Sequence, residues 1–155
     1  MMAAVLKEAR TPPLRTKQRG SFDLPLEASD AFDLFTAEGE RRWVKGWNPL
    51  ILSDCGGEGV GAVFLTDHGG EQTIWTVIEC DRKTGRLRYS RVAPGSRAGT
   101  VGVEISPTGE ASRVTVTYDL TALGPEGEVA VRAMDKPGFA AMMAEWRRLI
   151  IASLS

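Results

Sequence analysis

The strongest constraint on the fold is an apolar stripe in the last part of the chain, from about Pro137 to Leu154. Charged residues occupy the opposite side of the same helical repeat. This pattern predicts an amphipathic helix that lies with one face on another layer of the protein. Pro137 suits the first turn, because its ring fixes φ and it needs no amide partner there. The stripe comprises Phe139, Met142, Met143, Trp146, Leu149, Ile150 and Leu154.

Two short helices are predicted between a first strand and the rest of the chain. Apolar residues alternate with polar ones over 21–26, and Pro25 marks this strand as an edge or a strand end. Ser29 offers an N-cap hydroxyl to the first helix, which Gly39 ends or bends. Residues 40–44 can form a second short helix before a Gly, an Asn and a Pro break the pattern.

The middle of the chain is predicted to form strands and turns. Gly69 and Gly70 predict a two-residue hairpin turn. The glycine-rich run 56–61 lacks the Lys and Ser/Thr of a phosphate loop, and no helix follows it, so it is interpreted as a connection between strands. The remaining strands are expected over 51–53, 62–67, 72–81, 86–92, 101–105 and 114–120.

The turn at 83–85 decides which side chains of two long strands face the helix. A three-residue loop ending in a left-handed Gly85 would set Glu79 opposite Tyr89. A two- or four-residue loop would instead turn 74, 76 and 78 inward, because a one-residue slip inverts every side chain. We favour the first register. Its inward face comprises Trp75, Val77, Glu79, Leu87, Tyr89 and Arg91.

Length and charge limit the class of protein. A chain of 155 residues matches one domain, which we place at 16–155 after a mobile leader at 1–15. Lys plus Arg number 19 against 20 for Asp plus Glu, which argues against a nucleic acid partner. No stretch is apolar enough for a secretory signal or a membrane span, so the cytoplasm is the expected compartment. A homodimer is left open.

Chemistry-bearing residues are sparse. His68, the only histidine, falls beside the predicted hairpin turn and is interpreted as a solvated residue rather than a catalytic one. Cys55 and Cys80 lie far apart without CxxC spacing, so neither a disulfide scaffold nor a zinc site is expected. No nucleophile motif occurs. We therefore expect no metal and no cofactor, and assign no catalytic residue.

The order of elements resembles the helix-grip α+β fold of the START-like (SRPBCC) superfamily, in which a curved antiparallel sheet wraps a long C-terminal helix. That superfamily includes polyketide cyclases and dehydrases, birch-pollen-allergen-like proteins and the activator domain of the Hsp90 cochaperone. Local motifs resemble a bacterial branch of unsettled function. These motifs are Glu38-Gly39-Glu40 with Trp43, Gly46-Trp47-Asn48-Pro49, Tyr89 with Arg91-Val92 and Pro94, and Thr117-Tyr118-Asp119 leading to Thr121-Ala122-Leu123.

In such a fold the helix covers part of the concave face of the sheet, and side chains or a ligand must fill the remaining space. Arg91 is the sharpest candidate, because a guanidinium in an apolar cavity needs a carboxylate, a carbonyl or water. Glu79 could be its internal partner. Aromatic and Met side chains are also common core filling. The candidate ligand-binding residues are Trp47, Trp75, Glu79, Tyr89, Arg91, Tyr118, Met142, Met143 and Trp146.

Three functions remain open at this point. The first is binding of a small apolar molecule, such as a lipid, a polyketide or an aromatic metabolite. The second is a cyclase or dehydratase in which Tyr89, Glu79 or Arg91 moves protons or steadies an enolate. The third is a protein-interaction module like the cochaperone domain, which a filled cavity and an exposed apolar patch would favour.

Overall fold

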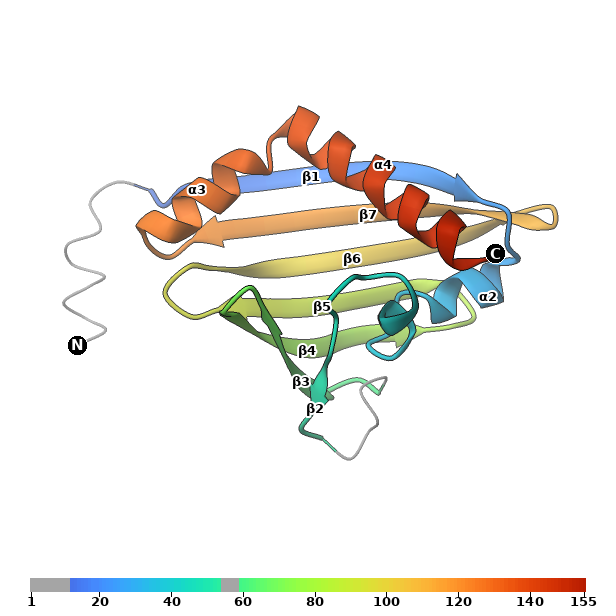
Figure 1. Cartoon of the computed structure of the whole chain (residues 1–155), viewed down its shortest axis with the longest axis horizontal. Helices are drawn as coiled ribbons and strands as arrows, with labels where there is room; N and C mark the ends of the chain where they lie inside the picture. Colours follow the sequence, from blue (N-terminus) through green and yellow to red (C-terminus); the bar gives the residue numbers. More distant parts are fainter. Residues whose placement is uncertain (1–11, 54–58) are drawn as a thin grey trace.

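The computed structural model describes residues 12–53 and 59–155. Within them, seven strands form one antiparallel sheet in the order β1-β7-β6-β5-β4-β3-β2 (Figure 1). Predictions for the leader up to residue 11 and for Cys55 lie outside the described residues. The strands are β1 (Arg15–Leu24), β2 (Leu50–Ile51), β3 (Val63–His68), β4 (Glu71–Asp81), β5 (Arg86–Ala93), β6 (Arg97–Thr108) and β7 (Ala111–Ala122).

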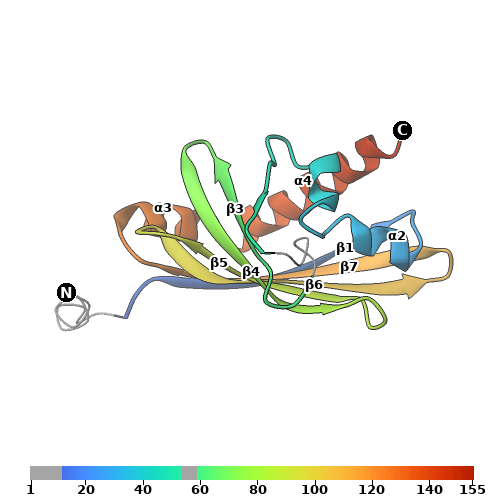
Figure 2. The same cartoon turned by 90° about the horizontal axis from the view of Figure 1, so that it is seen from below.

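The helices lie on one face of this sheet, which Figure 2 shows nearly edge-on. The long C-terminal helix crosses over β1 and β7 with its apolar stripe toward the strands, as the sequence predicts. The β3–β4 hairpin rises from the same face. The predicted helix-grip α+β fold is thereby confirmed. The helices are α2 (Ala28–Asp33), the 3-10 helix η1 (Gly39–Arg42), α3 (Pro125–Ala133) and α4 (Lys136–Ser153).

The core fills the space between α4 and the sheet. Phe139, Met143 and Ile150 of α4 are almost completely buried. β1 has a glycine under the helix, and a Cβ added at Gly20 would lie 3.0 Å from the Phe139 ring. The helix therefore packs directly on the backbone of the edge strand, and its N-terminal half leans away from β4 and β3.

One local prediction is wrong, and one helix has no counterpart among the predicted elements. α2 begins at Ala28, so Ser29 lies inside the first turn, and the N-cap position belongs to Glu27, which makes no side-chain cap. The helix α3 was not predicted at all. Its signals are present, since Pro125 stands in its first turn with Glu126 and Glu128, but the apolar residues are too few for a clear stripe.

The register between β4 and β5 combines both alternatives that the sequence leaves open. The turn has four residues, so Asp81 rather than Arg82 pairs with Arg86. A β-bulge between Val77 and Glu79 then restores the parity, and Trp75 comes opposite Arg91. The extra residue of the bulge is Ile78.

Candidate functional site

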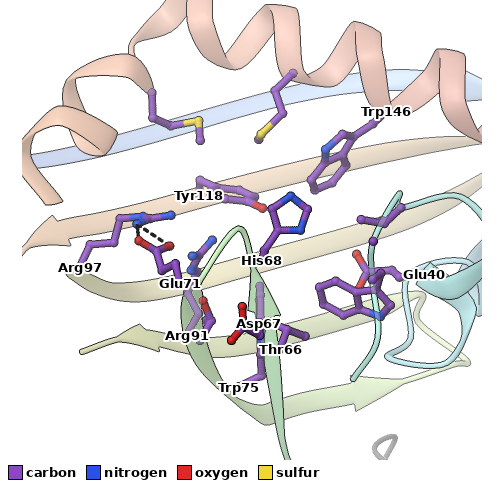
Figure 3. Close-up of a pocket in the computed structure, with 16 residues that line it drawn as sticks. Glu40, Thr66, Asp67, His68, Glu71, Trp75, Arg91, Arg97, Tyr118 and Trp146 are labelled. Atoms are coloured by element: carbon purple, nitrogen blue, oxygen red, sulfur yellow. Dashed lines mark hydrogen bonds and ion pairs between the residues drawn. The ribbon is translucent and has the colours of Figure 1, made fainter. Parts of the chain in front are cut away.

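A cavity of about 360 Å³ opens between the N-terminal half of α4 and the raised β3–β4 hairpin. Its third wall is the gate segment, which we define as residues 39–49 (Figure 3). The volume is at the lower end of the ~300–1,000 Å³ typical of small-molecule sites. The cavity is not filled by side chains, which distinguishes it from an ordinary core.

Six of the nine candidate residues line this cavity. They come from the gate segment, three strands and the helix, so the fold brings together positions that are far apart in the sequence. Each contributes an aromatic, thioether or guanidinium surface. The six are Trp47, Trp75, Arg91, Tyr118, Met142 and Trp146.

The other three candidates lie elsewhere. Glu79 is turned to the outer face of the sheet by the bulge and pairs there with Arg86 at 3.4 Å, so it cannot be the partner of Arg91. Tyr89 is buried below the cavity, where its hydroxyl donates to the Phe35 carbonyl at 2.6 Å. Met143 faces β1 instead of the cavity.

Aromatic rings form the floor and one wall. Trp75 stacks on Phe64 with centroids 5.9 Å apart, and Trp47 meets Trp75 edge to face at 5.7 Å. The indole nitrogen of Trp75 donates to the Thr66 hydroxyl at 2.9 Å, and that of Trp47 donates to the Ala37 carbonyl at 2.7 Å. Both rings are therefore held at fixed angles and present rigid apolar surface. Trp47 anchors the gate segment and also lines the cavity.

Arg91 brings a buried charge to the cavity. The side chain is 9% exposed, and its Nε has no hydrogen-bond partner. The guanidinium lies 5.1 Å from the centre of the Trp75 ring, a cation–π contact that replaces only part of its hydration. Burial lowers the pKa of Arg91, although the nearby Tyr118 opposes the shift. A guanidinium keeps its charge in proteins, so the site carries a cation with an unused donor.

A second arginine, Arg97, lies in the surroundings of Arg91. Arg97 forms an ion pair with Glu71 at 2.9 Å, so the Glu71 carboxylate is already engaged. Burial raises the pKa of Tyr118 to about 12, and the neighbouring Arg91 only partly offsets this effect. Tyr118 therefore stays a neutral hydroxyl at ordinary pH.

Glu40 supplies a carboxyl group to another part of the cavity. Figure 3 shows it on the gate segment, away from Arg91. No hydrogen bond or ion pair to this carboxyl occurs among the residues that the structure describes. Burial raises its pKa well above the ordinary value. Glu40 is the second residue of η1, after Gly39, and a Cβ at Gly39 would collide with the Asp33 carbonyl oxygen.

Sequence reasoning missed several residues of the rim and floor. His68 does lie beside the predicted Gly-Gly turn and is exposed, but it lines the mouth of the cavity, close to Gly46. Thr66 and Thr73 pair across the hairpin on the buried face, which the parity of Phe64 and Trp75 could have indicated. Arg97 and Glu71 gave no sequence signal, because their pairing depends on how β4 and β6 curve.

The fold and cavity together define a START-like (SRPBCC) helix-grip protein. The chain belongs to the family described as polyketide cyclase/dehydrase and lipid transport, whose family model matches residues 15–149. No curated protein matches the chain. Among the described helices, none has the length and apolar character needed to cross a membrane.

Solved structures with the same fold come from several sources. Norcoclaurine synthase from Thalictrum flavum is 16% identical with a TM-score of 0.64, covering 90% of this chain and 88% of that one. A protein from Thermobifida fusca is 19% identical with a TM-score of 0.62, covering 86% and 94%. Ara h 8.0201 is 12% identical with a TM-score of 0.63, covering 89% and 99%. These likenesses concern the fold.

Proposed function

We propose that this protein binds a small, mostly apolar molecule in the cavity, with an acidic or carbonyl group of that molecule placed against Arg91. The observation that carries the proposal is the guanidinium of Arg91, a residue that lines an open aromatic cavity and whose buried Nε lacks a hydrogen-bond partner. A buried charged donor left unpaired is unfavourable by about 1–3 kcal/mol or more. A ligand carboxylate or carbonyl would remove that penalty.

The walls support the same class of ligand. Trp47, Trp75 and Trp146 offer rigid surface for a flat or apolar body, and Met142 can adapt to its shape. Family membership is consistent with this use, since its description names polyketide and lipid chemistry. An open cavity of about 360 Å³ favours ligand binding over the protein-interaction alternative.

A cyclase or dehydratase activity in the same cavity is the second candidate. The observation that favours it is the raised pKa of Glu40, a half-buried acid in the same cavity as a fixed cation. Groups with displaced pKa values in a cleft are typical of proton-transfer sites. Tyr89 and Glu79 do not line the cavity, so this alternative would rest on Glu40 and Arg91.

Substitutions that change the charge or the shape of residue 91 test the binding proposal. Arg91→Met should weaken binding of anionic apolar compounds by about tenfold or more, the loss of a charge-assisted hydrogen bond. Arg91→Lys should weaken it less, because it keeps the charge. Native mass spectrometry of protein from its own host would show a retained molecule, and tryptophan-quenching titrations with matched anionic and neutral compounds would give affinities.

Arg88→Met is the matched control, since Arg88 is exposed on the opposite face of the same strand. It should leave every affinity unchanged. The proposal fails if anionic and neutral compounds bind equally well to the unaltered protein, or if Arg88→Met and Arg91→Met have the same effect.

A further inference from the structure

Two ionisable groups line separate parts of the cavity, with aromatic surface between them. Arg91 stands on β5, and Glu40 stands at the start of the gate segment. In Figure 3 their side chains are separated by the region in which Tyr118, Trp75 and His68 lie. The cavity therefore presents the guanidinium of Arg91 in one part and the carboxyl of Glu40 in another.

We propose that the cavity selects amphoteric ligands, in which an aromatic or apolar body carries an acidic group toward Arg91 and a basic amine toward Glu40. This inference rests on the proposed function and adds the substrate class. It does not follow from Arg91 alone, because a simple fatty or aromatic acid would satisfy Arg91 and leave the Glu40 end unused.

The surroundings of Glu40 favour an amine over an apolar group. Glu40 also lines a void of about 20 Å³ below the main cavity, where the neighbouring rings include Phe35, Tyr118 and Trp146. Tyr118 and Trp146 meet edge to face at 6.1 Å. An ammonium group gains both a carboxylate partner and contacts with electron-rich rings, whereas an apolar group would leave the carboxyl without a partner.

Other charged groups around the cavity do not neutralise Glu40. The strands contribute Asp67 and His68 from β3, Glu71 from β4, Arg91 from β5, Arg97 from β6 and Tyr118 from β7, and α4 contributes the uncharged Met142 and Trp146. Arg97 is already paired with Glu71, and no ion pair joins Glu40 to any of these side chains. Its neighbours along the chain include Arg41, which pairs with Glu38 instead.

A proton balance follows from this arrangement. In the empty cavity the burial of Glu40 favours the neutral acid. A ligand amine arrives as an ammonium ion, so an ion pair forms only when Glu40 gives its proton to the buffer. Binding should therefore release up to one proton, and affinity should rise with pH until Glu40 is ionised in the empty protein.

A matched set of three probes tests the inference on the full-length protein. The set is para-(aminomethyl)phenylacetic acid, para-ethylphenylacetic acid and para-ethylbenzylamine, each also prepared with a two-ring biphenyl spacer. The first carries both groups, and the others each replace one group by a methyl-terminated equivalent. Isothermal titration in buffers of different ionisation enthalpy would give affinity and proton release together.

The expected result is that the two-ended probe binds at least about tenfold more tightly than either one-ended probe and releases a proton. Glu40→Gln should remove this advantage and the proton release while leaving the acid-only probe unaffected. Glu38→Gln, at an exposed acid two residues before Glu40, is the control and should change nothing.

Different failures have different meanings. If the acid-only probe binds through Arg91 as tightly as the two-ended probe, the amphoteric inference is overturned and the proposed function stands. Equal losses for both probes in Glu40→Gln would also overturn it, because they would show a purely structural role. If no probe binds, the proposed function and this inference fail together.

Discussion

Glu40 links the stability of the fold to pH. Its carboxyl has an ordinary pKa of 4.5, which burial raises well above that value in the folded protein. Between these two pKa values the folded state binds more protons than the unfolded state. The free energy of unfolding therefore decreases as pH rises through this interval, because a neutral acid is kept in the fold while the unfolded chain ionises it.

Replacement of Glu40 by Gln should flatten this dependence. The substitution keeps a similar shape and removes the ionisation, so the variant should gain stability relative to the unaltered protein as pH rises above about 4.5. Urea unfolding at a series of pH values would measure the difference. Parallel pH curves for the two proteins would contradict the shift, and Glu38→Gln should follow the unaltered protein.

Single residues also show where sequence reasoning reached the site and where it stopped. Arg91 and Tyr118 were identified as cavity residues because they alternate with outward residues in regular strands. The predicted orientation of Glu79 was wrong, because the bulged residue inverts the facing of every side chain between the bulge and the turn. Glu40 was noticed as part of a family motif, but its burial depends on how the gate segment packs under α4, which no local pattern encodes.

At the scale of elements, different residues of α4 contribute to stability and to the wall of the cavity. Phe139 is 3% exposed and packs on Gly20, so Phe139→Ala should lower the free energy of unfolding by about 3–5 kcal/mol. Trp146 is only half-buried and faces the cavity, so Trp146→Ala should cost less and should enlarge the cavity. Denaturant unfolding and titration with bulkier ligands would separate the two effects.

Leu154→Ala, at the exposed end of the helix, is the control for this pair. Its effect should stay within about 0.5 kcal/mol. A loss for Trp146→Ala as large as that for Phe139→Ala would mean that the indole acts as core and that the cavity wall is less open than described.

The presence of helices and strands was easier to predict than the way in which the strands pair. The stripe of α4 and the alternation in β6 and β7 are local properties, so the sequence contains them directly. The helix α3 has end signals without a clear apolar face, and its Gly127 packs directly on the Ser96 backbone, a tertiary contact that no local pattern encodes. A turn of three residues and a turn of four cannot be separated by composition when both end in glycine.

At the scale of the whole molecule, a bound ligand would contact three parts of the chain at once. The gate segment, the β3–β4 hairpin and α4 each supply one wall of the cavity. A ligand that binds only the folded state at a concentration of 100 Kd should stabilise it by about 2.7 kcal/mol. The melting temperature should rise accordingly, and amide exchange in residues 39–49 should slow on binding.

Two variants test this expected rise in melting temperature. Arg91→Met should melt without a ligand-induced rise at the same concentration of an anionic compound, whereas Arg88→Met should show the full rise. Protection confined to residues far from the cavity would place the ligand elsewhere on the molecule.

The bulge at Ile78 has a consequence for how this chain can change in length. The residues on either side of Ile78 already pair in sequence with Tyr89 and Arg88, so removing Ile78 would preserve both sets of partners while straightening β4. Removing Thr76 would also be absorbed at the bulge, because Val77 and Ile78 would take the places opposite Ser90 and Tyr89 while Trp75 keeps its place opposite Arg91. A one-residue deletion at or beside the bulge would thus change the curvature of the sheet while Trp75 stays in the wall of the cavity.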